Sequence, residues 1–432
     1  MTRIAQIRIT PIALKDPPLL NASGVHEPFT LRSIIEIEGA DGTLGLAETY
    51  GDDDTLKRLQ AVAPALRGIG THDLAALAAA VRRHGLGQHD GPVLDLAPGS
   101  KPARALDKVF AAFETGLADL NARRAGLPLC DWLGGRLRDR VPYSAYLFYK
   151  FGRHHGQPYG VGDVGDAGVA GDPWGEALDA AAMVRQAQTM VAQYGFGSIK
   201  LKAGVFEPVL EADCLLALHE AFPTHPLRID PNGNWSLDTA LRVAERVGSA
   251  LEYYEDPVPT LADMAELQRR TGLMLATNMV VCDRAEFAAN AALGAPVRTI
   301  LSDHHFWPGF RATRELAALC DTFGLKLSMH SNSHAGISLM AMTHLAASTP
   351  GLAYACDTHY PWQSEDVIRG GRVPFVDGCV ALGSAPGLGV DLDPEALAAL
   401  HEQYLRCGVR SRNDTREMQK HQPGFVKVKP RF

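Results

Sequence analysis

Polar side chains end a series of short apolar runs in the second half of the chain, and their types could support chemistry at one site. In chain order they are Lys200 and Lys202, Asp230 and Asn232, Glu255, Asn278, Asp303, and His330. Successive intervals of 25, 23, 25 and 27 residues separate Asp230, Glu255, Asn278, Asp303 and His330. A strand, a helix and two loops take roughly 24 residues, so each step fits one βα unit. In a parallel barrel the carboxyl ends of the strands converge on one mouth, where barrel enzymes place their chemistry.

Three of these residues carry oxygen atoms suited to a hard divalent cation. Asp230, Glu255 and Asn278 end successive runs, with no thiolate or imidazole among them. Such a set favours Mg²⁺ or Mn²⁺ over zinc, and it leaves about three octahedral positions for water and a bidentate substrate. A lone carboxylate at a strand end more often caps the next helix. Three in successive units, bracketed by bases, instead predict a metal site.

The residues on either side of this set are candidate bases. Lys200 and Lys202 stand two apart in an expected strand, SIKLKAG, so both project from the same face. The charge of Lys200 is expected to lower the pKa of Lys202 and make its neutral amine available. A single histidine is usually a satisfied core residue, but Asp303 can hold the imidazole of His330 in one tautomer. Two bases across a metal suit removal of the proton α to a carboxylate from either face.

The elements that must position these residues form two regions. Residues 4–14 and 31–52 indicate β strands, with a hairpin signal at Asp41 and Gly42, and a helix is expected over 105–126. From about 177, β-like runs alternate with helices, one of them capped by Ser236. Counting YSAYLF as the first strand gives eight βα units. No glycine-rich phosphate loop follows a strand, so a barrel is favoured over a doubly wound open sheet.

Composition narrows the functional classes. The chain has 432 residues, a net charge of −7 and a pI near 6.1, which argues against nucleic acid or an anionic membrane surface as partner. Its seven scattered cysteines contain no C-x-x-C, which fits a reducing compartment. No run approaches the roughly 20 apolar residues of a membrane span. We therefore expect a cytoplasmic protein.

Motifs along residues 140–392 resemble the enolase superfamily, and within it the glucarate dehydratase family. They are FGSIKLKAG, IDPNGNWS, YYEDP, LATNM, LSDHHFW, HSNSHAGISLM, DTHYPWQ and PGLGVDLD, and LLNASGVHEPF near the N-terminus resembles the first substrate loop of that family. An asparagine as the third metal ligand resembles the arrangement in this family, whereas racemases and lactonising enzymes generally use a carboxylate there. The resemblance implies a (β/α)8-type, TIM-like barrel with an N-terminal α+β capping domain completed by the C-terminal segment. The implied boundaries are 1–138, 139–385 and 386–432.

The resemblance also implies roles for single residues. Asp230, Glu255 and Asn278 would bind Mg²⁺; Lys202, tuned by Lys200, would be one base, and His330 with Asp303 the other. Eight further residues would contact an acid sugar: Asn21, His26, Tyr146, Asn232, Ser331, Asn332, His359 and Arg412. Arg412 could bind the distal carboxylate through its planar fork.

One segment departs from the family. Where the family has a Thr-Phe motif that holds the far end of the substrate, this sequence reads DGPVLDLAPGSKPARAL, within about 92–106. The departure bears on which acid sugar fits, and not on the metal or the bases. The stretch 152–176, rich in Gly, His and Asp, is either a flap over the site or a disordered insert.

The function implied is Mg²⁺-dependent dehydration of D-glucarate or L-idarate to 5-keto-4-deoxy-D-glucarate, a hydro-lyase reaction. The 152–176 stretch and the 21–26 loop would close over the site. Alternatives are the same chemistry on another diacid such as galactarate, epimerisation without loss of water, or a weakly active paralog that binds a true dehydratase. A homo-oligomer is expected, with a small sugar diacid as ligand and no nucleic-acid or membrane partner.

Overall fold

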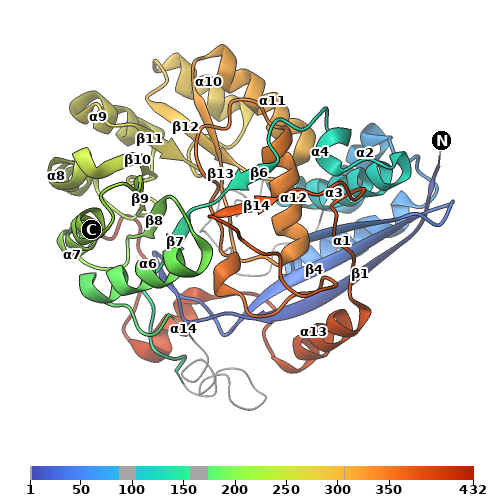
Figure 1. Ribbon diagram of the computed structural model, residues 1–432, viewed down its shortest axis with the longest axis horizontal. Helices are drawn as coiled ribbons and strands as arrows, with labels where there is room; N and C mark the ends of the chain where they lie inside the picture. The colour runs from blue at the N-terminus through green and yellow to red at the C-terminus, as the bar shows by residue number, and fades with distance from the viewer. Residues whose placement is uncertain (1, 87–103, 156–173, 306) are drawn as a thin grey trace.

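Seven parallel strands form one curved sheet that carries the predicted site residues (Figure 1). The computed structural model describes residues 2–86, 104–155, 174–305 and 307–432. The strands pair in chain order: β7 (Ala145–Leu147), β8 (Ile199–Lys202), β9 (Leu227–Asp230), β10 (Leu251–Glu255), β11 (Leu275–Thr277), β12 (Val297–Ser302) and β13 (Lys326–Met329). Most of their residues are buried, as in parallel sheets that are covered on both faces.

The eighth predicted strand is not a regular strand. The run that contains it forms single bridges, at Tyr143–Cys356 and Leu327–Leu352. The N–H groups of Ala353 and Asp357 donate to carbonyl groups of β13, while Ser144, just before β7, donates to the carbonyl group of Cys356. This segment therefore spans the gap between the first and last strands. The barrel prediction is confirmed, with the correction that the closing segment lacks a continuous ladder.

Helices cover the outside of the curved sheet (Figure 1). They are α6 (Ala180–Tyr194), α7 (Pro208–Ala221), α8 (Leu237–Val247), α9 (Leu261–Thr271), α10 (Arg284–Ala292), α11 (Gly309–Thr322) and α12 (Gly336–Ser348). Ser236 caps α8 as predicted, because its hydroxyl accepts a hydrogen bond from the N–H of Thr239. Each of the other helices has exposed residues, but every residue of α12 is buried.

The N-terminal region is an antiparallel sheet backed by helices. Its three long strands pair in the order β1 (Ile4–Lys15), β4 (Phe29–Gly39) and β5 (Leu44–Tyr50), and the predicted hairpin joins the last two. Gly42 turns that hairpin with φ of 82°. One apolar cluster joins this sheet to α1 (Asp53–Leu66), α2 (Leu74–His84) and α3 (Ala105–Ala125). The helix predicted over 105–126 is thus confirmed, and it ends where Gly126 adopts a left-handed conformation.

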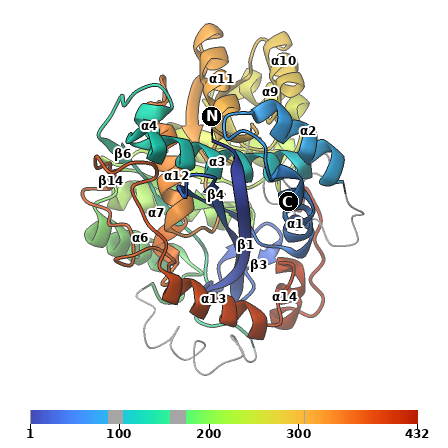
Figure 2. The same cartoon turned by 90° about the vertical axis from the view of Figure 1, so that its right-hand side faces the viewer.

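The C-terminal residues return to the N-terminal sheet. The helix α13 (Pro394–Arg406) packs along β1, with Nδ1 of His401 2.7 Å from the carbonyl oxygen of Pro11 and Nε2 of Gln403 donating to Ala13 at 2.8 Å. The helix α14 (Asp414–His421) lies beside β3 (Gly24–Val25), which forms a small hairpin with β2 (Leu20–Asn21) (Figure 2). The boundaries near 138 and 385 stay a prediction.

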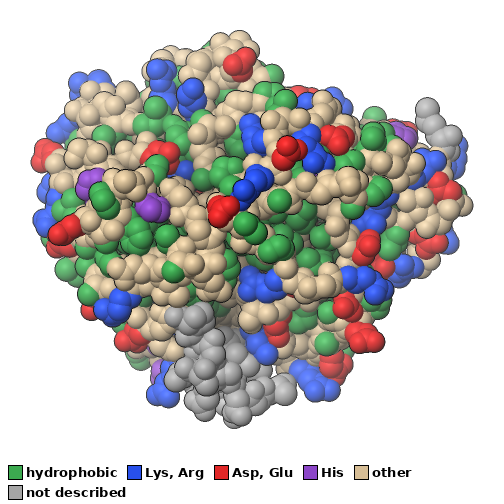
Figure 3. Space-filling view, in the orientation of Figure 1, with side chains coloured by type: hydrophobic (Ala, Val, Ile, Leu, Met, Phe, Trp, Pro, Cys, Tyr) green, Lys and Arg blue, Asp and Glu red, His purple; other side chains and the backbone are tan. Residues whose placement is uncertain are grey.

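The remaining elements and the surface complete the description. A short helix α4 (Leu129–Trp132) follows α3, and β6 (Arg140–Pro142) pairs with β14 (Cys379–Ala381). The altered segment near 92–106 and the 152–176 stretch lie largely outside the described residues. Among the helices that the structure does describe, none is long and apolar enough to cross a membrane. On the face shown in Figure 3, acidic and basic side chains are interspersed.

Candidate active site

The predicted metal ligands and lysines meet at the carboxyl ends of β8 to β11. Nζ of Lys202 lies 2.6 Å from Oδ2 of Asp230, and Nζ of Lys200 lies 2.6 Å from Oε2 of Glu255. The side-chain N–H of Asn278 donates to Oε1 of Glu255 at 2.9 Å. All five side chains are buried. The strands therefore bring together the residues that their spacing grouped in the sequence.

Buried acidic groups outnumber buried basic groups at this point. Asp256 and Asp357 join Asp230 and Glu255, so four carboxylates lie within the reach of the two lysines and Arg228. Burial would raise the pKa of Asp230, but Lys202 and Lys200 lower it to about 2. Burial raises the pKa of Asp256 to about 7 and that of Glu255 well above its usual range, and the neighbouring carboxylates add to both shifts. The cluster holds more acidic groups than its own cations neutralise.

The donor set fits a hard divalent cation. Oδ1 of Asn278 is buried and has no hydrogen-bond partner among the described residues, as a free ligand oxygen would be. Two carboxylates and this amide oxygen match the preference of Mg²⁺ for oxygen ligands. Without this amide oxygen, the His, Cys, Asp and Glu side chains of the described residues contain no group of three placed to hold a metal. Asp230, Glu255 and Asn278 remain the residues that would bind it.

Backbone geometry fixes these ligands in place. Asp256 has φ of 37°, a left-handed conformation that few non-glycine residues adopt, and its carboxylate accepts from the N–H of Asn278 at 2.8 Å. Asn232 has φ of 57°, and its N–H donates to Oδ1 of Asp230 at 2.9 Å. These bends turn the chain sharply after β9 and β10. The side chains at the strand ends are thereby held toward the mouth of the barrel.

Lys200 and Lys202 share one carboxylate, and Lys200 has two further acidic partners. Oδ2 of Asp230 lies 2.6 Å from Nζ of Lys202 and 3.7 Å from Nζ of Lys200, and besides Glu255, Nζ of Lys200 lies 2.6 Å from Oδ2 of Asp357. Burial would lower the pKa of Lys200, but Asp357 and Glu255 raise it well above its usual value. Lys200 thus keeps the charge that its predicted tuning of Lys202 requires. The tuning itself stays a prediction.

Asp303 and His330 lie on the opposite side of the mouth. Nδ1 of His330 is 3.4 Å from Oδ2 of Asp303, and both side chains are buried. Burial would raise the pKa of Asp303, but His330 and His304 keep it below its usual value. The carboxylate can therefore hold Nδ1 of His330 as the protonated nitrogen and leave Nε2 for chemistry.

One cavity joins the two bases. Its walls include Lys202 and His330 together with all eight predicted substrate contacts: Asn21, His26, Tyr146, Asn232, Ser331, Asn332, His359 and Arg412. Thr30, Leu31, Arg32, Tyr50 and Asp52 of the N-terminal region, with Phe148 and Ser333, complete the wall. Residues from the two ends of the chain and from the barrel thus enclose one space.

Several predicted contacts already have protein partners. The guanidinium group of Arg412 donates through Nε and Nη2 to the two oxygens of Asp414, at 2.6 and 2.7 Å, so that edge of its fork is occupied. A substrate carboxylate could use only the remaining N–H groups on Nη1 and Nη2, so the predicted bidentate contact stays a prediction. Asn21 donates to the same Asp414 at 2.7 Å. His26 has Nδ1 3.0 Å from Oδ2 of Asp16.

The other contacts form a second set around the bases. The hydroxyl group of Tyr146 donates to Oδ2 of Asp230 at 3.3 Å, and Ser331 lies 3.4 Å from Nδ1 of His359. Burial, with His26 and His334 nearby, lowers the pKa of His359 well below its usual value, so its ring is neutral. Nδ2 of Asn232 lies 2.9 Å from the sulfur of Met279.

Asp357 is the site residue that the sequence prediction missed. It binds Lys200 and lies 3.6 Å from Nη1 of Arg228. Its signal was present, because Asp357 follows His330 by the same 27 residues that separate His330 from Asp303. Asp414 was also missed, and no spacing rule links it to the barrel.

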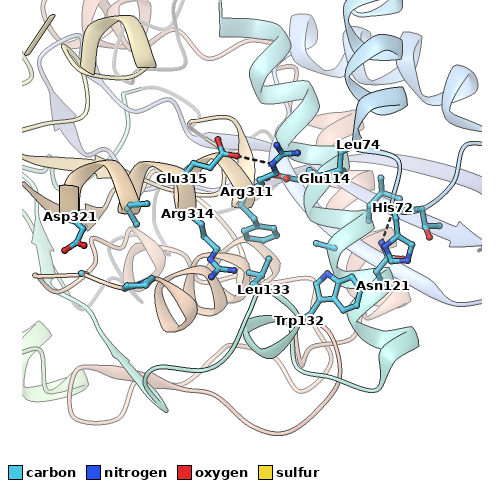
Figure 4. Close-up of a pocket in the computed structure, with 18 residues that line it drawn as sticks. His72, Leu74, Glu114, Asn121, Trp132, Leu133, Arg311, Arg314, Glu315 and Asp321 are labelled. Carbon is cyan, nitrogen blue, oxygen red and sulfur yellow. Dashed lines mark hydrogen bonds and ion pairs between the residues drawn. The ribbon is translucent and has the colours of Figure 1, made fainter. Parts of the chain in front are cut away.

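A larger cavity lies elsewhere and shares no lining residue with this one. It has a volume of about 770 Å³ and lies between α3 and α11 (Figure 4). Glu114, Trp132 and Arg314 are among its lining residues, and none of the predicted site residues is. Size alone would select this cavity, but the converging bases and oxygen ligands select the smaller one.

The comparisons with known proteins agree with this geometry. A family model described as "Enolase C-terminal domain-like" matches residues 182–396. A "Probable glucarate dehydratase" from Streptomyces coelicolor is 46% identical over 99% of this chain and 98% of that protein. An enolase from Pseudomonas fluorescens, solved with magnesium, potassium and tartrate, is 53% identical with a TM-score of 0.93, covering 100% of this chain and 99% of that one. An enolase from Thermobispora bispora, solved with magnesium and formate, is 44% identical with a TM-score of 0.93 over the full length of both chains.

These matches, with the fold and the site, define an enzyme of the enolase superfamily. Within that superfamily the chain belongs to the glucarate dehydratase family, as its motifs predicted. The prediction of a hydro-lyase is confirmed at the level of the family.

Proposed function

We propose that this protein is a Mg²⁺-dependent dehydratase of a sugar diacid that converts D-glucarate or L-idarate to 5-keto-4-deoxy-D-glucarate. One observation carries the proposal. Lys202 and the Asp303–His330 pair line the same cavity, with Asp230, Glu255 and Asn278 at the mouth of the barrel. The magnesium and tartrate bound by the Pseudomonas fluorescens enolase support this assignment, since tartrate is also a hydroxylated diacid.

The chain supplies the proton transfers. Lys202 or His330, depending on the configuration of the substrate, takes the proton from the carbon α to one carboxylate. The electron pair of that C–H bond moves toward the carboxylate and then forms the new C=C bond as the β C–O bond breaks. His330 donates a proton to the departing hydroxyl group, which leaves as water. The enol product then tautomerises to the keto-deoxy diacid.

Mg²⁺ bound by Asp230, Glu255 and Asn278 would supply positive charge where negative charge develops on the substrate carboxylate. Lys200 would keep Lys202 available as a base through its own charge. Tyr146, Asn232, Ser331, Asn332 and His359 would orient the hydroxyl groups of the substrate, and Asn21, His26 and Arg412 its far end. In the cavity these residues surround the two bases.

Proton NMR with D-glucarate and Mg²⁺ in D₂O, with and without EDTA, tests the proposal. We expect metal-dependent loss of the substrate signals and the appearance of a keto-deoxy diacid. Deuterium incorporation without loss of water would make the protein an epimerase. No change with D-glucarate, L-idarate or galactarate, together with a stable complex with another protein, would show a paralog that acts as a binding partner.

A further inference from the structure

Three buried glutamates bind backbone N–H groups close to the catalytic strand ends. They are Glu211, Glu48 and Glu114, and none was among the predicted site residues. The first N–H groups of a helix, and those of a tight loop, have no partner within their own element. When such groups are buried away from water, a carboxylate from elsewhere can satisfy them and also complement the helix dipole.

On the Lys202 side the supporting glutamate belongs to the barrel. Glu211, within α7, accepts from the N–H groups of Gly204, Val205 and Phe206 at 2.8, 2.8 and 3.0 Å. These residues begin two positions after Lys202. The barrel thus holds the loop after Lys202 with a residue five to seven positions further along the same βα unit.

On the His330 side the supporting glutamate belongs to the N-terminal sheet. Glu48, in β5, accepts from the N–H of Ala335 at 2.8 Å and from the N–H of Ser338 at 2.9 Å. The helix α12 needs this contact because it is wholly buried and its N-cap, Ala335, has no side chain that could cap it. Glu48 therefore holds the start of the helix that follows His330 together with Asp366, whose Oδ1 accepts from the N–H of Gly336 at 3.0 Å.

Two further side chains extend this contact toward His330. Nε of Arg32 donates to Oε1 of Glu48 at 2.7 Å, and its Nη1 lies 3.4 Å from Oδ1 of Asn332. Asn332 in turn donates through Nδ2 to the hydroxyl group of Tyr50 at 2.6 Å. We call Arg32, Glu48 and Tyr50 the Glu48 clamp. The clamp binds the chain at Asn332, Ala335 and Ser338.

Glu114 provides a parallel contact for Asp303. It lies in α3, and its Oε2 accepts from the N–H of Phe310 at 2.8 Å at the start of α11, where the N-cap is Pro308 and supplies no side-chain hydrogen bond. Figure 4 shows Glu114 beside Arg311 on the wall of the larger cavity. The segment that carries Asp303 is thus also held by a residue outside the barrel.

We infer that the N-terminal region positions the His330 half of the site through the Glu48 clamp, whereas the barrel alone positions Lys202. The inference rests on the proposed function, because that function assigns His330 as a base. Glu48 itself does not line the cavity, so it acts as a positioning residue. Loss of the clamp should impair the base on one face of the substrate and spare the base on the other.

The test compares Glu48→Gln with Glu211→Gln on the two epimers. The variants Lys202→Ala and His330→Asn first show which base serves D-glucarate and which serves L-idarate. Initial rates of deuterium incorporation at the α carbon are then measured by NMR in D₂O with Mg²⁺. Displacement of a catalytic group by about 1 Å costs roughly 100-fold, so we expect Glu48→Gln to slow the His330-dependent epimer at least about tenfold more than the other. Glu211→Gln should show the opposite preference.

A second variant and a second measurement keep the test decisive. Arg32→Met combined with Glu48→Gln removes both charges of the buried pair and avoids an unpaired guanidinium group. Hydrogen exchange measured by mass spectrometry should show faster exchange over 331–338 in both Glu48 variants, and unchanged exchange over 203–207. Equal slowing of both epimers, or unchanged exchange over 331–338, would overturn the inference. A wild type that exchanges neither epimer would instead overturn the proposed function, while the mass spectrometry would still decide whether Glu48 holds this segment.

Discussion

The two halves of the site differ in the sequence separation between each base and the residue that supports it. The lysine half is local, because Lys202 and the residue that supports its loop, Glu211, are nine positions apart. The histidine half spans the chain, because His330 depends on a segment bound by Glu48, more than half the chain away. A base supported within one βα unit is as rigid as the barrel. A base supported across two regions is only as well placed as the contact between them.

The two bases would respond differently to a movement of the N-terminal region when substrate binds. The N-terminal region contributes Asn21, His26, Tyr50 and Asp52 to the cavity wall, so the proposed substrate contacts and the clamp come from the same region. Any shift of this region on binding would move the His330 segment with it, whereas Lys202 would stay in place. The proposed general acid, His330, and the proposed substrate contacts of the N-terminal region would therefore be mechanically linked.

Substitution of the two proposed bases should produce the largest loss of activity and show which epimer each half of the site serves. A positioned general base contributes about 10²–10⁴-fold, so we expect Lys202→Ala and His330→Asn each to slow proton exchange on one epimer by this amount and to spare it on the other. Exchange rates with D-glucarate and L-idarate in D₂O measure both. If the two variants kept full activity on their preferred epimers, the assignment of the bases would be wrong.

Removal of the partner of His330 should give the next largest effect. In Asp303→Asn an amide replaces the carboxylate 3.4 Å from Nδ1, so the tautomer and orientation of the imidazole are no longer fixed. We expect about a 100-fold loss on the His330-dependent epimer, comparable with other misplaced catalytic groups. The Lys202-dependent epimer serves as the internal control. A loss shared equally by both epimers would point to a general structural defect.

The sequence predicted the barrel, and grouped the candidate catalytic residues, because both follow from short-range periodicity. Regular steps of 23 to 27 residues place Asp230, Glu255, Asn278, Asp303 and His330 at one mouth without any knowledge of long-range contacts. The irregular form of the closing segment was not predicted, because this segment follows β13 at the interval expected of one more barrel strand. Its single bridges depend on how the first and last strands meet, which local pattern does not encode.

The support of the site was not predictable for the same reason. Glu48 lies in β5, where every residue from Gly45 to Tyr50 is buried, so local pattern does not distinguish this glutamate from its neighbours. Its role appears only once α12 is known to be fully buried and to begin at a residue with no capping side chain. Asp414 is similar, since it joins Asn21 and Arg412 from opposite ends of the chain. Contacts of this kind require the folded arrangement.

Two of the supporting glutamates, Glu114 and Glu211, should also appear in the pH dependence of stability. Burial raises the pKa of Glu114 and of Glu211 from 4.5 to about 7 in the folded protein. Between these values the folded state binds protons that the unfolded state has released, so the free energy of unfolding falls as the pH rises from about 4.5 to 7 and levels off above. Each group accounts for up to about 3 kcal/mol of this fall.

The matched Gln variants isolate this contribution on each side of the site. Glu114→Gln and Glu211→Gln cannot titrate, so each should be less pH-sensitive than the wild type in denaturant titrations at pH 5 and pH 7.5. Relative to the wild type, both variants should gain stability on going to the higher pH. A variant whose stability runs parallel to that of the wild type at both pH values would show that the glutamate stays ionised in the fold.

Substitution of Tyr50 should give the smallest effect and the sharpest test of the comparison. Tyr50→Phe removes only the hydroxyl group that accepts from Asn332, and the ring keeps its contacts with Arg32 and Lys108, whose charged groups lie 5.1 and 4.1 Å from its centroid. One lost hydrogen bond costs about 1 kcal/mol. We therefore expect deuterium incorporation at the α carbon, measured by NMR in D₂O, to slow a few-fold for the His330-dependent epimer alone. Tyr254→Phe is the control, because it removes a buried phenol that bonds within the barrel, to the carbonyl oxygen of Ala240. If both phenylalanine variants changed the two epimers equally, the hydroxyl group of Tyr50 would contribute to stability and not to the position of His330.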